Sequence, residues 1–338
     1  MVSRVRLYLS GDGQRLRHLQ NDLTIGRVSP NTDKRQEQII KVAAAQLSPV
    51  YLDKQQTVSK ACSAIADAGS NGAEIVVFPE AFVSGYPDWV WLIPNSKGSE
   101  LNELYQKLVA SAIRVPDEST AELCKAAKAA NINVVIGINE VNSETSGGSL
   151  YNSILFIDSK GEILGTHRKL VPTGGERLIW AQGDGRSLNT YETSSGKLGG
   201  LVCWEILMPL ARNALYKKGI QIIATPTWDK SPNWRISMQH IAREGGVFVI
   251  SVCQALRMED IPDELGFKKL YPEGREWINH GNSCIVAPNG KIVAGPLEAE
   301  EGILYADIDL SEIIAAKRMF DVVGHYSRPD VFDQKNSI

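Results

Sequence analysis

Cysteine is scarce in this chain and is not arranged for cross-linking. The 338 residues include five cysteines, an odd number, and no two of them form a C-x-x-C pair. This spacing argues against a disulfide framework and against a cysteine zinc site, and it fits a reducing compartment. We therefore predict a cytoplasmic protein whose cysteines remain free thiols.

Long apolar runs and a strong charge of one sign are also missing. No apolar run approaches the roughly 20 residues that cross a bilayer. The 36 basic and 39 acidic residues give a formal net charge of −3, which indicates no basic surface for nucleic acid or for acidic membranes. We expect neither a membrane nor a nucleic acid as a partner.

Several familiar catalytic motifs are absent. The five histidines are scattered without an H-E-x-x-H pattern, and no G-x-S-x-G turn occurs, so zinc-dependent and serine hydrolases are disfavoured. The glycine pairs match neither a Walker A loop nor G-x-G-x-x-G. No metal and no cofactor are expected.

The chain does contain an alternation of strand and helix signals that begins near Lys41. Such alternation predicts an α/β fold with helices packed on the faces of sheets. The predicted strands are Lys41–Leu47, Glu74–Phe78, Asn133–Asn139, Leu150–Asp158, Leu198–Cys203, Gln221–Pro226, Val247–Val252, Ser283–Ala287 and Ile303–Asp307. The predicted helices are Gln55–Ala68, Glu100–Ala112, Ser119–Ala130, Met208–Lys218, Trp234–Glu244 and Ser311–Arg318.

Tight turns and composition complete the outline of the fold. Asn289-Gly290 and Ser159-Lys160-Gly161 each predict a hairpin, so the sheets should be mixed rather than purely parallel. Residues 1–40 are interpreted as an N-terminal extension with a strand near Val5–Leu9. Residues 41–310 are the predicted domain, and residues 311–338 a C-terminal arm that contacts another subunit.

Cys203 is the most informative of the five cysteines. It ends the apolar run 198–203, and a helix is predicted directly behind it, with Pro209 in its first turn and Gly219 just past its end. The partial positive charge at a helix start favours a thiolate. The alternative is a buried core cysteine, which is how we interpret Cys62, Cys124, Cys253 and Cys284.

Glu80 also follows an apolar strand. Pro79 should end that strand and leave Glu80 at its carboxyl edge, where ligands usually bind in α/β sheets. The neighbouring Phe78, Phe82 and Tyr86 indicate burial, and a buried carboxylate needs a partner. The alternative is a solvated loop glutamate.

Lys169 can complete a device for acyl transfer with these two residues. A thiolate is the nucleophile, a carboxylate can take its proton, and an ammonium stabilises a developing anion. We expect the charge of Lys169 to lower the pKa of Glu80 and so to keep this carboxylate ionised despite burial.

Three motifs in this order resemble the nitrilase (carbon–nitrogen hydrolase) superfamily. They are Phe78-Pro-Glu-Ala-Phe82, His167-Arg-Lys-Leu-Val-Pro-Thr173 with Glu176, and Val202-Cys-Trp-Glu205. Trp204-Glu205 directly after the cysteine is most similar to the nitrilase branch. The resemblance extends from about Val42 to Asp330.

The resemblance implies a four-layer α-β-β-α sandwich with two mixed β-sheets that dimerises through its helical faces. It also implies roles: Glu80 as general base, Lys169 as stabilising cation and Cys203 as nucleophile. Glu176 would position the lysine and the substrate, and Trp204 would lend its backbone N–H to the oxyanion site. The implied reaction converts a nitrile to the carboxylic acid and ammonia through a thioimidate and a thioester.

Alternatives remain at this stage. An amidase or carbamoylase would use the same triad on an amide, and a silent binding protein could share the scaffold. Ile206 replaces a polar residue that relatives often carry, which could change the share of amide released. The rings expected to line the pocket and to favour aromatic or arylaliphatic nitriles are those of Tyr86, Trp89, Trp91 and Trp228. The alternative is that these rings serve the core or a subunit contact.

Overall fold

The computed structural model describes residues 39–332. The predicted strand near Val5–Leu9 and almost all of the N-terminal extension lie outside the described residues. Within residues 39–332, no helix is long and apolar enough to cross a membrane.

Two mixed sheets form the centre of the described chain, as the hairpin turns predict. In the first sheet the strand order is β13-β1-β2-β3-β4-β5, and in the second it is β10-β11-β9-β8-β7-β6, with β12 paired to β11. The first sheet comprises β1 Ile39–Gln46, β2 Ile75–Val77, β3 Asn133–Val141, β4 Leu150–Ile157, β5 Ile163–Arg168 and β13 Gly302–Asp309. The second comprises β6 Thr190–Thr193, β7 Gly196–Gly200, β8 Ile222–Thr227, β9 Phe248–Cys253, β10 Ala255–Arg257, β11 Trp277–Val286 and β12 Ile292–Glu298.

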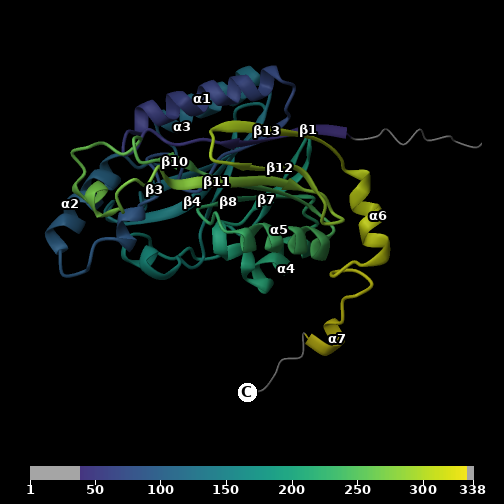
Figure 1. Cartoon of the computed structure of the whole chain (residues 1–338). Coiled ribbons are helices and arrows are strands. Elements are labelled where there is room, and N and C mark those ends of the chain that lie inside the picture. The colour runs from purple at the N-terminus through teal and green to yellow at the C-terminus, as the bar shows by residue number, and fades with distance from the viewer. Residues whose placement is uncertain (1–38, 333–338) are drawn as a thin grey trace, which may run out of the picture. The chain divides into compact units, whose positions relative to one another are not determined.

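Helices cover the outer face of each sheet. Figure 1 shows α1 (Lys54–Ser70) and α3 (Glu118–Ala130) on one side of the strands, and α4 (Pro209–Lys217) and α5 (Pro232–Gly245) on the other. The layers of the predicted α-β-β-α sandwich are therefore present. The remaining helices are α2 Gly98–Ala110, α6 Ser311–Met319 and α7 Pro329–Phe332.

The alternation of side chains along the strands explains why the two sheets pack against each other. In β1, Val42 and Ala44 belong to the apolar cluster between the sheets, whereas Ala43 and Ala45 belong to the cluster under α1 and α3. This period of two buries both faces of the strand. This burial fixes the position of each strand end and therefore the position of the residues that follow it.

Local signals explain the helix boundaries. Asp53 accepts a hydrogen bond from Gln56 N at the start of α1, and Asp117 forms a capping box with Thr120 at the start of α3. Both helices begin within one residue of the predicted positions.

One predicted strand boundary was wrong, two strands were not predicted, and two cysteines are less buried than expected. The strand that carries the thiol ends at Gly200, and Cys203 instead opens a 3₁₀ turn, because its backbone turns to a φ of +52°. The short strands β6 and β10 were not predicted, since runs of this length give little periodicity. Cys62 and Cys124 are only partly buried, so they are not full members of the core, whereas Cys253 and Cys284 are.

Candidate active site

Glu80 lies just past the end of β2 and is fully buried. Its main-chain carbonyl accepts a hydrogen bond from Gln254 Nε2 at 2.7 Å, which fixes the turn from a neighbouring strand. Gly137 of β3 makes room for this turn, since a Cβ atom there would collide with the Pro79 carbonyl and lie 2.7 Å from Ala81 N. The strand end therefore presents the Glu80 carboxylate in a dry interior.

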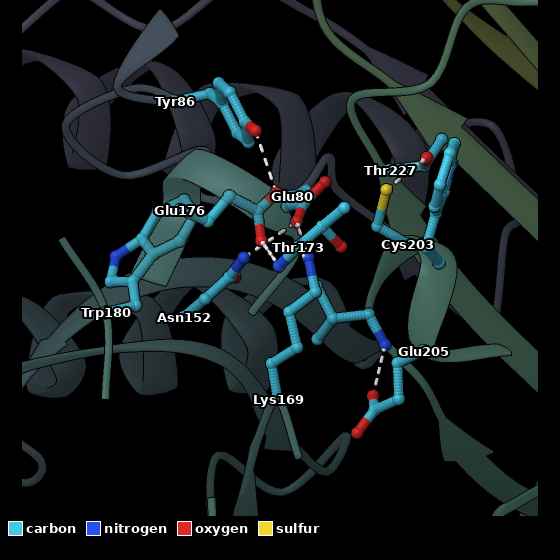
Figure 2. Close-up of polar contacts among 12 residues, drawn as sticks. Glu80, Tyr86, Asn152, Lys169, Thr173, Glu176, Trp180, Cys203, Glu205 and Thr227 are labelled. Atoms are coloured by element: carbon cyan, nitrogen blue, oxygen red, sulfur yellow. Dashed lines mark hydrogen bonds and ion pairs between the residues drawn. The ribbon is translucent and has the colours of Figure 1, made fainter. Parts of the chain in front are cut away.

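The two oxygens of Glu80 have different surroundings. Oε1 accepts hydrogen bonds from Lys169 Nζ at 3.0 Å and from Asn152 Nδ2 at 2.7 Å, as Figure 2 shows. Oε2 is buried and has no hydrogen-bond partner among the described residues. Oε1 therefore accepts both hydrogen bonds, and the lone pairs of Oε2 remain available to accept a proton.

Burial raises the pKa of the Glu80 carboxyl, and the charge of Lys169 opposes that rise without cancelling it. The charge of Lys169 lowers the pKa of Glu80 as expected, but burial and the charge of Glu176 outweigh it, so the net pKa lies above its ordinary value. Desolvation outweighs the ion pair because both side chains are buried.

Lys169 follows directly on β5 and is buried with its ammonium between two carboxylates. Nζ donates to Glu176 Oε2 at 2.7 Å in addition to Glu80. Burial alone would lower the pKa of Lys169, but the negative charges of Glu80 and Glu176 outweigh it and raise the pKa. This ammonium is a permanent positive charge.

Glu176 lies in the 3₁₀ turn after Lys169 and is anchored at both oxygens. Oε2 accepts from Thr173 N at 2.7 Å, and Oε1 accepts from the Tyr86 hydroxyl at 2.8 Å. Glu176 therefore fixes the position of the Lys169 ammonium, while its other oxygen is held by the Tyr86 hydroxyl.

Cys203 is buried at the start of its 3₁₀ turn, where the Thr227 hydroxyl donates to Sγ at 3.2 Å. Burial and the negative charge of Glu80 raise the pKa of this thiol, against a lowering by Lys169. The predicted thiolate at a helix start is therefore not supported, because α4 begins only at Pro209, after the turn. The raised pKa favours the thiol over the thiolate at Cys203.

A cavity of about 340 Å³ opens beside the sulfur. It is lined by Tyr86, Trp91, Thr173, Glu176, Cys203, Trp204, Trp228, Asp229 and Ser231. Glu176, Trp204, Tyr86, Trp91 and Trp228, which the sequence suggested for substrate contact, are among them. The expectation that Trp89 also lines the pocket was wrong, because its ring is fully buried in the core.

Hydrogen bonds fix the aromatic walls of this cavity. The rings of Tyr86 and Trp228 are stacked with centroids 4.5 Å apart and an angle of 6° between their planes. Trp228 Nε1 donates to Asp88 Oδ1 at 3.0 Å, and the half-exposed Trp204 donates from Nε1 to Asp229 Oδ2 at 2.8 Å. The cavity therefore has flat walls that are held in place before any ligand binds.

Ile206 does not affect the polarity of this cavity. Its side chain is fully buried in the apolar cluster between the second sheet and its helices. The concern that this aliphatic residue removes a polar group beside the nucleophile is therefore not supported by its position.

Sequence reasoning missed Asn152, Gln254 and Thr227, which contact Glu80 or Cys203. Asn152 lies inside a predicted strand, Gln254 follows the end of another, and Thr227 follows Pro226 at the end of a third. Nothing in their local pattern distinguishes them from ordinary strand residues. Only the pairing of strands brings them to the two reactive groups.

Comparisons with known proteins agree on one family. Residues 41–318 match the family model described as carbon–nitrogen hydrolase. The chain is 43% identical over 319 residues to Nitrilase 1 of Arabidopsis thaliana, covering 93% of this chain and 89% of the relative. It is 41% identical over 294 residues to the aliphatic nitrilase of Sinorhizobium fredii (strain HH103), covering 86% and 94%.

A solved structure supports the fold. The carbon–nitrogen hydrolase from Helicobacter pylori G27 superposes with a TM-score of 0.67 at 21% identity, covering 89% of this chain and 99% of that chain. At this identity the likeness extends to the sandwich and not to the details of the site.

Proposed function

This chain belongs to the carbon–nitrogen hydrolase family as an enzyme of its nitrilase branch, and we propose that it hydrolyses a nitrile with Cys203 as nucleophile, Lys169 as fixed cation and Glu80 as base. The observation that carries this proposal is the ammonium held between two buried carboxylates next to a buried thiol. The products are the carboxylic acid and ammonia. Glu176 keeps the ammonium in place.

The first step forms a bond between the sulfur and the nitrile carbon. Because the raised pKa favours the thiol, its proton must leave as the bond forms, and Glu80 Oε2 is the acceptor without a competing donor. Negative charge builds on the nitrile nitrogen, where the ammonium of Lys169 and the N–H of Trp204 stabilise it. The proton then passes to the nitrogen and a thioimidate results.

Two waters complete the reaction. The first gives a proton to Glu80 and adds to the thioimidate carbon, and Glu80 returns this proton to the nitrogen. The new hydroxyl group then gives its proton to the nitrogen as the C–N bond breaks, so that ammonia leaves and a thioester remains. The second water attacks the thioester, the C–S bond breaks, and the acid and the free thiol are formed. Glu80 alternates between base and acid, which suits a carboxyl whose pKa is raised above its ordinary value.

Removing the thiol tests this assignment. Cys203→Ala should fold and should release no ammonia from any nitrile in a panel scored for ammonia, acid and amide. Thr227→Val is a matched control that keeps the thiol and removes only its hydrogen-bond donor, so it should retain measurable turnover. Turnover by Cys203→Ala near that of the wild type would contradict the mechanism.

The cavity supports a preference for aromatic or arylaliphatic nitriles. The stacked rings of Tyr86 and Trp228 offer a flat apolar wall, and Trp91 and Trp204 add further rings. The kcat/KM for phenylacetonitrile should exceed that for a short aliphatic dinitrile. A clear preference for the dinitrile would rule out this substrate class.

An amidase or carbamoylase using the same triad is the alternative. Supplying benzonitrile and benzamide to the same preparation separates the two, because hydrolysis of the amide alone would favour the alternative. Trp204-Glu205 after the nucleophile and the nitrilases among the relatives favour the nitrile.

We also propose that the protein forms a homodimer through its outer helices. In this proposal the C-terminal arm, residues 311–338, makes a further subunit contact, and the protein is located in the cytoplasm. Apolar side chains on α4 and α5 support the dimer, since Leu210 is 84% exposed and Ile236 is 62% exposed. Leu210→Asp should lower the mass measured by light scattering after gel filtration. An unchanged mass would place the contact elsewhere.

A further inference from the structure

We infer that Glu205 is a positioning residue that fixes the Lys169 segment against the Cys203 turn, an inference that rests on the function proposed above. Glu205 extends from the thiol-bearing turn towards the segment that carries the cation (Figure 2). Its side chain is completely buried. It takes no part in the mechanism above.

Three donors from the two segments converge on this one carboxylate. Oε2 accepts from Val202 N at 2.7 Å, and Oε1 accepts from Leu170 N at 2.8 Å. Val202 immediately precedes Cys203, and Leu170 immediately follows Lys169. The carboxylate therefore joins the main chain beside the nucleophile to the main chain beside the cation.

His167 supplies the third donor. Its Nε2 lies 3.0 Å from both oxygens of Glu205, and Ser187 Oγ lies 3.3 Å from its Nδ1. Since both carboxylate oxygens already accept main-chain hydrogen bonds, Nε2 must carry the hydrogen that faces them, and the Ser187 hydroxyl can donate to Nδ1. His167 thus holds the carboxylate from the side of β5.

This joint matters because the two reactive groups come from different sheets. Lys169 follows β5 of the first sheet, whereas Cys203 follows β7 of the second. The apolar contacts that pack the two sheets against each other are not directional. Hydrogen bonds to a carboxylate are short and directional, so Glu205 sets the distance between ammonium and sulfur more closely than packing does.

A Glu205→Gln variant of the full chain tests the inference through two readouts. One is the kcat and KM of ammonia release from phenylacetonitrile, and the other is the pH at which iodoacetamide alkylates Cys203 at half its maximal rate. A displacement near 1 Å can cost about 100-fold in rate. We expect kcat to fall by roughly 10- to 100-fold at nearly unchanged KM, and the alkylation midpoint to rise.

The direction of the midpoint separates positioning from a direct charge effect. Removing the negative charge of Glu205 would by itself lower the midpoint, so a rise reports that the ammonium has moved away from the sulfur. Glu74→Gln is the matched control, because Glu74 accepts from Ser195 Oγ at 2.9 Å at the start of β2, the end of that strand opposite Glu80. It should leave both readouts unchanged.

The results test the positioning role of Glu205 separately from the proposed nitrile hydrolysis. An unchanged or lowered midpoint in folded Glu205→Gln overturns the inference, as does an equal loss of kcat in Glu74→Gln. If the wild type hydrolyses no nitrile, the proposed function fails while the alkylation midpoints still decide the positioning role.

A second pair of variants covers the case in which Glu205→Gln does not fold. His167→Gln keeps an N–H donor for the carboxylate, whereas His167→Leu does not. We expect the glutamine variant to retain several times more kcat and a midpoint closer to that of the wild type. Equal values in the two variants overturn the inference.

Discussion

Asn152→Leu should move the acid limb of the pH–rate profile to higher pH. Leucine keeps most of the volume of asparagine and keeps water out, but it removes the 2.7 Å hydrogen bond from Nδ2 to Glu80 Oε1. That bond lowers the pKa of the carboxyl, so its loss must raise the pKa further. The base is active in its ionised form, and hence activity is lost at a higher pH as the solution is acidified.

The size of the effect follows from the strength of the bond. A hydrogen bond to a charged group contributes about 1.5–3 kcal/mol. Since about 1.4 kcal/mol corresponds to one pH unit, the acid limb of kcat/KM should move up by about one to two pH units. Rates well above this limb should change much less, because Lys169 still holds the same oxygen.

The assay is ammonia release from one nitrile across a range of pH, with the folded state checked by circular dichroism at each value. Asn133→Leu is the matched control. Asn133 is equally buried, donates from Nδ2 to the Glu74 carbonyl at 3.0 Å, and has a carbonyl oxygen without a partner, as does that of Asn152. An acid limb that stays in place or moves down in folded Asn152→Leu would refute the role given to Glu80.

Three further changes follow from the same geometry. Lys169→Met leaves two buried carboxylates without a counter-charge, so the free energy of unfolding at pH 7 should fall by about 3–5 kcal/mol. The fall should be smaller near pH 5, because the carboxylates gain protons there. Urea titrations at both pH values would measure this difference. Tyr86→Phe removes a hydrogen bond to Glu176 but keeps the stack on Trp228. The free energy of unfolding measured by urea titration should fall by about 1.5–3 kcal/mol. The KM for phenylacetonitrile should stay within threefold of the wild-type value. Gly137→Ala forces a Cβ atom into the Pro79 carbonyl, so kcat and the thermal midpoint should both fall; a fully active, stable variant would show that the turn can move freely.

The pattern of the sequence predicted an α/β fold with mixed sheets, whereas the four-layer sandwich was implied only by the resemblance to a family. Residues 42–45 form a continuous apolar run, which is typical of a strand buried on both faces, and the structure places Val42 and Ala44 on one face of β1 and Ala43 and Ala45 on the other. The two turn signals correctly predicted mixed sheets. Errors fell where a segment was too short to show a period, as in β6 and β10.

The sequence also identified the cavity residues Tyr86, Trp204 and Trp228, but only through order along the chain and resemblance to a family. It did not predict the state of the thiol. A helix start behind Cys203 suggested a thiolate, whereas the structure places a 3₁₀ turn there and surrounds the sulfur with burial and negative charge. Charge at a site depends on every group around it, and most of those groups are distant in sequence.

The sequence by itself therefore determined the elements, the mixed sheets and the types of group available for chemistry, since these depend on neighbours along the chain. The tertiary structure alone decided which oxygen of Glu80 stays free, which side chains hold it, and how Glu205 joins segments from two sheets. These features arise where strands from distant parts of the sequence end side by side. No local pattern encodes such a meeting, because the free energy that fixes it comes from the packing of whole sheets.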